Sequence, residues 1–299
     1  MSQRTEVQYA PTQQYNSGTR IFQQPIYASA NFEQLSFHKI KPTSAAAHQF
    51  QEGEFVPLGF FDKVDPALFK LPAGEVEWLY EKRRTAQQIL PFLYLGPWSC
   101  LSERDWLNQD GITLLLAVRD RRLAVARLVS GEKAAADLGI VADSVDIQDY
   151  QELITALPQA ICRINEHIAS SAPLGLNGRT EKKVLVFCET GNGSSVLVVV
   201  AYLMVMLNLG VAQALQVVQS QRFCIDVDES ATQLLLAFEA IINAKRDVER
   251  VRRASSLDVS VPPKKRSHDR DTDENDVDEY MAVDETRKPS APFQDRPAY

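Results

Sequence analysis

The stretch Lys183-Val-Leu-Val-Phe-Cys-Glu-Thr-Gly-Asn-Gly-Ser-Ser195 decides the fold of this chain. It begins with a short apolar run, Val184 to Phe187, whose length and β-branched content predict a buried strand. Cys188 then opens a loop with two glycines, and the apolar segment from Val196 to Leu209 predicts a buried helix. A strand, a loop of small residues and a helix N-terminus together aim backbone N–H groups at an anion. A thiolate is stabilised at the head of such a loop, so the layout predicts a phosphate site with a cysteine nucleophile.

The same stretch resembles the signature of the cysteine-dependent dual-specificity protein phosphatases, which is His-Cys, five residues, Arg, then Ser or Thr. Cys188 stands at the nucleophile position, Phe187 replaces the histidine and Ser194 replaces the arginine. The resemblance implies a phosphate loop made of Glu189, Thr190, Gly191, Asn192, Gly193 and Ser195.

Replacement of the arginine is the more serious change. A phosphate monoester is a dianion, and a planar guanidinium binds two of its oxygens and follows their charge into the transition state. A charge-assisted hydrogen bond contributes about 1.5–3 kcal/mol, and the neutral hydroxyl of Ser194 is too short to replace it. Phe187 also removes a polar partner that helps keep Cys188 ionised. The loop is therefore interpreted as a phosphatase site that has lost its catalytic activity.

Two residues keep alternative interpretations. Cys188 is either a small buried hydrophobic residue at a strand end or a partly activated thiol held by loop N–H groups. Asp149 falls where the family keeps its general acid, with Asp146 as the other candidate, and the alternative is a solvated loop aspartate.

The resemblance extends beyond the loop, to the catalytically inactive serine/threonine/tyrosine-interacting members of the same family. It covers about residues 75–245. The signature residue that is missing differs, because those members lack the cysteine and keep the arginine, whereas this chain keeps Cys188 and has Ser194 in place of the arginine. The segments that carry it are Glu77 to Ser99, Gly111 to Thr113, Gln221 to Ile225, Glu239 to Ile241 and the basic-then-acidic tail.

Strands that alternate with helices predict an α/β fold, with a central, mainly parallel sheet flanked by helices as in the cysteine-dependent phosphatases. One expected helix covers residues 153–168, with Pro158 in its first turn. The predicted organisation is a disordered extension over 1–50, a linker or packed strap over 51–74, the phosphatase-like domain over 75–245 and a disordered basic-then-acidic tail over 246–299.

The composition argues against metal, nucleic-acid and membrane functions. Four widely spaced cysteines indicate neither a disulfide framework nor a zinc site, so no metal and no cofactor are expected. The formal net charge of −7 argues against nucleic acid as a partner. The longest apolar run, Val196 to Leu209, is shorter than the roughly 18–20 residues of a membrane span, so no membrane is expected.

The tail carries two basic clusters, Arg252-Arg253 and Lys264-Lys265-Arg266, which resemble a bipartite nuclear-import signal that binds an import receptor in extended form. This predicts a protein of nucleus and cytoplasm, and the alternative is an ordinary charged tail. Ser255 follows the first cluster at the spacing of a basophilic-kinase site, and a phosphate there would weaken the import signal.

These observations lead to three alternative hypotheses for the function. The first is a non-catalytic regulator or scaffold of signalling or ubiquitin-ligase components, for which the family resemblance implies F-box proteins and MAP kinases as partner classes. The second is a weak protein phosphatase that uses Cys188 and Asp149, with an arginine from elsewhere, such as Arg179 or Arg222. The third is a phospho-residue binding module that uses the loop amides alone.

Overall fold

Five strands form one mixed sheet in the order β1-β2-β5-β3-β4. The computed structural model describes residues 44, 47–72, 76–171 and 181–257. β1 is antiparallel to β2 and the other neighbours are parallel, which confirms the mainly parallel sheet. The strands are β1 (Gln87–Leu90), β2 (Leu93–Pro97), β3 (Leu114–Asp120), β4 (Val141–Ile147) and β5 (Val184–Cys188).

The central strand β5 is buried along its whole length. It pairs with β2 on one side and β3 on the other, and helices cover both of its faces, which explains why its sequence is continuously apolar rather than alternating. The register sets Pro97 beside Cys188, so the cysteine leaves the sheet at the end of two neighbouring parallel strands.

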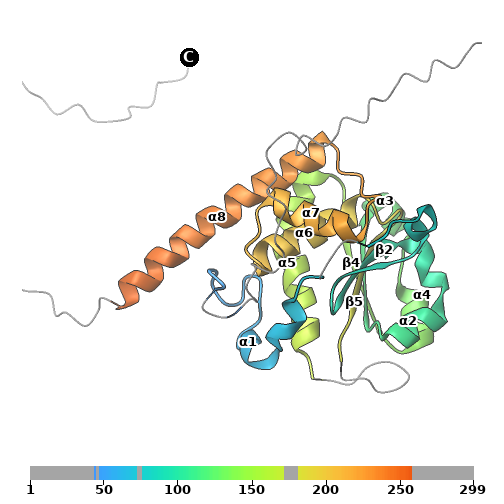
Figure 1. Ribbon diagram of the computed structural model, residues 1–299, viewed down its shortest axis with the longest axis horizontal. Coiled ribbons are helices and arrows are strands. Elements are labelled where there is room, and N and C mark those ends of the chain that lie inside the picture. The colour runs from blue at the N-terminus through green and yellow to red at the C-terminus, as the bar shows by residue number, and fades with distance from the viewer. Residues whose placement is uncertain (1–43, 45–46, 73–75, 172–180, 258–299) are drawn as a thin grey trace, which may run out of the picture. The chain divides into compact units, whose positions relative to one another are not determined.

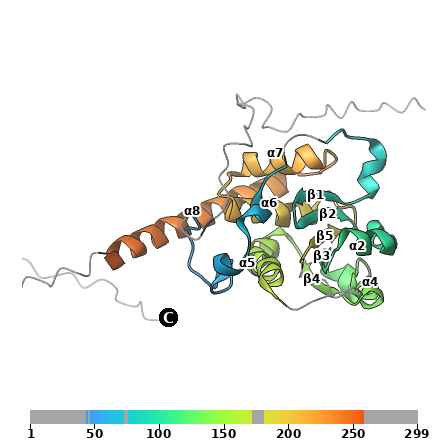
Figure 2. The same ribbon diagram turned by 60° about the horizontal axis from the view of Figure 1, so that its bottom comes forward.

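Helices pack on the two faces of the sheet (Figures 1 and 2). One face carries α5 (Tyr150–Ala169), α6 (Ser194–Met206), α7 (Val211–Gln221) and α8 (Glu229–Leu257), and the other carries α2 (Arg104–Asp110) and α4 (Glu132–Leu138). The short helix α3 (Arg121–Val125) follows β3. No helix in the described part of the chain has the length and apolar character needed to cross a bilayer.

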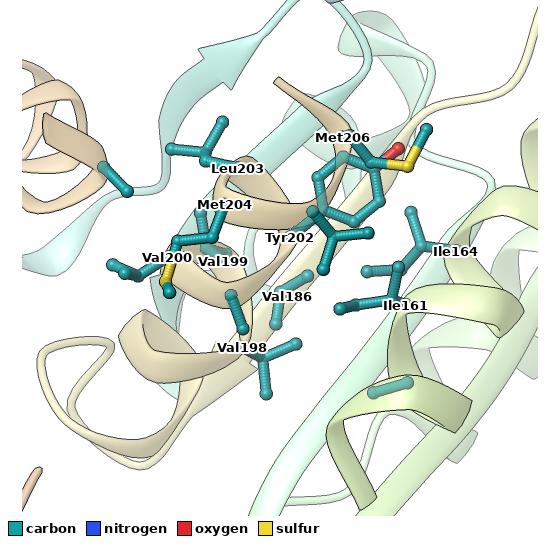
Figure 3. Packing of buried hydrophobic residues seen from close by; sticks show 14 of the residues in the cluster. Ile161, Ile164, Val186, Val198, Val199, Val200, Tyr202, Leu203, Met204 and Met206 are labelled. Atoms are coloured by element: carbon teal, nitrogen blue, oxygen red, sulfur yellow. The ribbon is translucent and has the colours of Figure 1, made fainter. Parts of the chain in front are cut away.

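Helix α6 lies at the centre of the helical layer, and every residue from Ser195 to Met206 is buried. Figure 3 shows Tyr202 and Val198 of α6 beside Ile161 and Ile164 of α5. A helix that is apolar on all sides is one that is enclosed on all sides, so the uniform apolar content of α6 follows from its place in the core.

Residues 48–71, here called the aromatic strap, pack into this same core. The strap includes α1 (Phe60–Lys63), and its buried side chains are Phe50, Phe55, Val56, Phe60, Val64, Phe69 and Leu71. Of the two alternatives for 51–74, the described residues adopt the strap, and the folded unit begins before residue 75. Each buried phenylalanine removes a large apolar area from water, which outweighs the weak local preferences of this segment.

Hydrogen bonds from distant helices hold the strap. Asn165 of α5 is fully buried, and its Nδ2 donates to the carbonyl oxygen of Phe55 at 2.7 Å while its Oδ1 accepts the hydroxyl of Tyr202 at 2.7 Å. Arg253 of α8 donates to the carbonyl oxygens of His48 at 3.0 Å and Phe50 at 3.2 Å. The strap is therefore fastened by hydrogen bonds to two helices, α5 and α8, rather than laid over the surface.

Helix boundaries differ from the prediction in two places. α8 runs to Leu257, so residues 246–257 are helical and not part of a disordered tail, because Arg246 and Arg253 bind the core and the strap. α5 begins at Tyr150, which places Pro158 in the helix interior and not in its first turn. Residues 1–43 and 258–299 lie outside the described part of the chain.

Replacing Phe55 by alanine should lower the free energy of unfolding by about 3–5 kcal/mol, because the ring is fully buried and leaves a cavity. The matched control is Leu58→Ala in the same strap, where the side chain is 71% exposed and the change should stay within about 0.5 kcal/mol. Urea unfolding followed by circular dichroism measures both. Equal stability of the two variants would contradict the packing of the strap.

Candidate functional site

The loop between β5 and α6 passes over the end of β2, and this crossing requires glycine at position 191. Gly191 has a φ of +72°, and an added Cβ would lie 2.4 Å from the carbonyl carbon of Gly96. No other residue has both the backbone freedom and the small size for this approach. The close contact fixes the loop directly above the two parallel strand ends.

Cys188 points its sulfur into the loop. Its Sγ accepts the N–H of Gly191 at 3.2 Å and the hydroxyl of Ser195 at 3.0 Å. Burial raises the pKa of Cys188, but the hydroxyl and N–H of Ser195 and the N–H groups of Gly193 and Gly191 outweigh it, so the pKa lies below its usual value. These hydrogen bonds agree with a partly activated thiol, and the burial of Cys188 at the end of β5 agrees with the other interpretation, so both stay open.

The two replaced signature positions lie on different elements, Ser194 on α6 and Phe187 on β5. Ser194 is the first residue of α6 and is half-buried, with a neutral hydroxyl where the family has a guanidinium. Phe187 is fully buried in the smaller apolar cluster, with Leu115 and Leu138. Its ring approaches within 3.4 Å of where a Cβ on Gly131 would lie, so it fills space on the α2 and α4 side of the sheet.

Arg222, at the end of α7, is fully buried beneath the loop. Its Nε donates to the carbonyl oxygen of Gly191 at 2.9 Å, and its Nη2 donates to Asn192 Oδ1 at 2.9 Å. The same guanidinium also donates to the carbonyl oxygens of Arg83, Thr85 and Thr190 and to Oε1 of Gln87.

The acceptors of Arg222 are thus neutral oxygens of the loop and of the segment before β1. Burial lowers the pKa of Arg222, and the nearby thiols of Cys224, Cys188 and Cys100 oppose that shift. Because the guanidinium is engaged from below, it holds the shape of the loop and does not replace the missing signature arginine. Arg179, the other candidate, lies outside the described residues.

The two candidate aspartates, at the end of β4 and directly after it, both have structural partners. Asp149 is the N-cap of α5, and its Oδ1 accepts the N–H of Glu152 at 2.9 Å. Asp146, within β4, forms an ion pair with Arg119 at 2.7 Å. Asp149 is therefore a helix cap, a role that neither of its two sequence interpretations included. An aspartate followed three residues later by a glutamate is a recognisable helix start.

The surroundings of the loop are acidic. Burial raises the pKa of Tyr150, and the charges of Asp228, Asp226 and Cys188 raise it further. Asp226 donates its backbone N–H to the carbonyl oxygen of Asn192 at 2.8 Å, and Glu189 is exposed at the start of the loop. Negative charges near the loop disfavour a phosphate dianion there.

The other predicted residues do not join this site. Arg252 and Arg253 lie on α8, where each pairs with Glu249, at 2.6 Å and 2.7 Å. Ser255 is exposed on the same helix, and its hydroxyl donates to the carbonyl oxygen of Val251. The cluster from Lys264 to Arg266 lies outside the described residues. Among the described residues no group of three or more His, Cys, Asp or Glu side chains is placed to hold a metal ion.

Sequence reasoning missed the structural role of Arg222, because its partners lie up to 139 positions away in the chain. The arginine appeared only as a possible substitute in catalysis. No local pattern marks a residue of this kind, since its acceptors are mostly main-chain carbonyl groups.

Comparison with known proteins agrees with the geometry of strand, loop and helix. The profile of the dual specificity phosphatase catalytic domain matches residues 93–241, which include β2 to β5 and the loop. The chain belongs to the dual-specificity phosphatase family.

Within that family, the chain is similar to the serine/threonine/tyrosine-interacting proteins. The protein of Homo sapiens is 30% identical over 186 residues, which is 62% of this chain and 78% of the relative. Protein A of Xenopus laevis is 28% identical over 175 residues, 58% of this chain and 73% of the relative. The crystal structure of the human tyrosine phosphatase-like serine/threonine/tyrosine-interacting protein matches with a TM-score of 0.41 and 28% identity, and covers 53% of this chain and 98% of its own.

Replacing Ser195 by alanine should raise the pKa of Cys188, because the thiolate loses a hydrogen bond from the hydroxyl. Alkylation by iodoacetamide requires the thiolate, so its rate profile should shift to higher pH. At neutral pH the rate at Cys188 should fall about two- to tenfold, since one hydrogen bond contributes about 0.5–1.5 kcal/mol. Peptide mass spectrometry separates Cys188 from the other cysteines. Thr190→Ala, in the same loop, removes a hydroxyl that accepts the N–H of Asn192, and as the control it should leave the profile in place.

Replacing Arg222 by lysine should lower the free energy of unfolding by about 2 kcal/mol or more, because buried acceptors lose their donors at about 1–3 kcal/mol each. Arg250→Lys, where the side chain is 64% exposed beside Asp247, is the control and should change stability by less than about 0.5 kcal/mol. Chemical denaturation measures both. A neutral Arg222→Lys change would show that the guanidinium geometry is not required.

Proposed function

We propose that this chain is a catalytically inactive member of its family, which regulates or scaffolds other proteins through the surface of its phosphatase-like domain. The observation that carries the proposal is Ser194 at the position of the signature arginine, on the first turn of α6. A hydroxyl there supplies neither the charge nor the bidentate geometry that phosphoryl transfer uses.

Three arginines support this proposal, because each already has partners. Arg222 donates to the underside of the loop, Arg119 pairs with Asp146 and Arg121 pairs with Glu152. Glu189 lies in the loop and Asp226 contacts it through its backbone N–H, so carboxylates adjoin the place of a bound dianion. The loop keeps its shape, but its electrostatics no longer favour a phosphate substrate.

The proposed partners are proteins, and the family resemblance suggests F-box proteins or MAP kinases, that is, ubiquitin-ligase or signalling components. The relatives' name describes them as interacting with serine/threonine/tyrosine. We further propose that the basic clusters of the tail bind an import receptor and that the protein is present in nucleus and cytoplasm. Because Arg252 and Arg253 are helical and paired with Glu249, receptor binding in extended form requires the last turns of α8 to unwind.

A second candidate is a weak phosphatase that uses Cys188, which the lowered pKa of its thiol favours. The position of the general acid opposes it, because the carboxylate of Asp149 accepts a helix N–H. A third is phospho-residue binding by loop amides. The N–H of Gly191 is directed at Cys188 and that of Asn192 at Thr190, which leaves fewer donors for a ligand. Isothermal titration with phosphotyrosine and phosphothreonine peptides tests it, and no heat at millimolar peptide excludes it.

The decisive test is hydrolysis of a small aryl phosphate by the wild type, Cys188→Ser, Ser194→Arg and the double variant Phe187→His with Ser194→Arg. The wild type should show no turnover above that of Cys188→Ser. Restoring the arginine should produce turnover, because the loop, the thiol and its hydrogen bonds are already in place.

The single Ser194→Arg variant is needed because Phe187 is fully buried among apolar residues, where a histidine destabilises the fold. Thermal unfolding of all four proteins separates loss of fold from loss of chemistry. Turnover by the wild type that disappears in Cys188→Ser would overturn the proposal and favour the enzyme.

A further inference from the structure

Helix α8 has two different faces. The face on the domain buries Leu235, Phe238, Ile242, Arg246 and Glu249, each at most 8% exposed. Figures 1 and 2 both show the C-terminal half of α8 leaving the layer formed by α5, α6 and α7. The outward face of that half is where apolar side chains remain in contact with water.

The outward face carries apolar residues in a regular order. Ile241 is 40% exposed, Val248 is 70% exposed and Val251 is 66% exposed. Together with exposed small residues they form what we call the α8 seam, which consists of Ala237, Ile241, Ala244, Val248, Val251 and Ser255.

The spacing along the α8 seam alternates between four and three residues, which is the seven-residue repeat of helices that supercoil around one another. In that repeat Ile241 and Val248 occupy one core position, and Ala244 and Val251 occupy the other. A helix that only covers a domain needs no second apolar stripe on its solvent side. The α8 seam is about 27 Å long at 1.5 Å per residue, and it meets the requirements of a helix-to-helix contact.

We propose that the α8 seam is a dimerisation surface, on which α8 of a second copy of this chain packs in parallel. β-branched residues at the core position of Ile241 and Val248 favour a parallel coiled coil of two helices. The flanking charges select the same arrangement, because in a parallel pair Asp247 faces Arg252 of the other copy, at positions 67% and 60% exposed.

An antiparallel pair would bring the flanking Lys245 of one copy toward Arg252 of the other, and like charges at such positions repel. Both side chains have partners within their own chain, in Glu54 and Glu249, and both remain more than 40% exposed. The contact is isologous, since the same face is used by both copies. It is short and contains alanine, so the association is weak and depends on protein concentration.

Sedimentation equilibrium of the full-length protein tests the association. The average mass of the wild type should rise from 33.5 kDa toward twice that value with concentration. Val248→Asp should weaken dimerisation about tenfold or more, because each copy buries an unpaired charge. Val125→Asp makes the same change at a valine of α3 that is 83% exposed, and it should associate as the wild type does.

Crosslinking tests the orientation. Ile241→Cys should form disulfide-linked dimers on oxidation in a parallel pair. In an antiparallel pair centred on the seam, the two cysteines would lie about 15 Å apart, beyond the reach of a disulfide. The wild type, with its four cysteines, is oxidised in parallel as the control.

A wild type that is monomeric at every concentration overturns the proposal, as does a dimer that Val248→Asp leaves unchanged. A dimer without Ile241→Cys crosslinking overturns the parallel arrangement.

Discussion

The buried guanidinium of Arg222 is the interaction on which the rest of the site depends. It joins the loop after β5 to the segment that precedes β1, two regions that the sheet alone does not connect. Its acceptors are mostly main-chain carbonyl groups, so most of these bonds do not depend on side-chain identity, the exceptions being those to Asn192 and Gln87. The loop therefore keeps its shape largely through main-chain contacts, together with the close approach at Gly191.

This arrangement separates the two uses of arginine in the site. One arginine is structural, buried and still present as Arg222, whereas the one that would bind a phosphate is replaced by Ser194. Arg222 keeps its hydrogen bonds to the loop with serine at position 194. A fold of this kind can lose its chemistry while its surface, and any binding that uses the surface, is preserved.

The sequence predicted the elements that a local pattern of residues encodes. The β5 strand, the loop and α6 follow one another within a short stretch, and their apolar content reports their burial directly. The sequence did not decide whether residues 51–74 form a linker or a packed strap, because the phenylalanines have no periodicity. Their partners, such as Asn165 and Arg253, are more than 100 residues away. The cap at Asp149 had a local signal in Glu152, although the sequence was interpreted only in terms of a solvated loop aspartate or a general acid. The role of Arg222 had no local signal at all.

The strap also bears on how the protein is made. Arg253, which donates to the carbonyl oxygen of His48, is made 205 positions after it. Closing so long a loop is slow and entropically costly. During synthesis the strap can therefore contact α5 before α8 exists, and its fastening is completed only when Arg253 has been made.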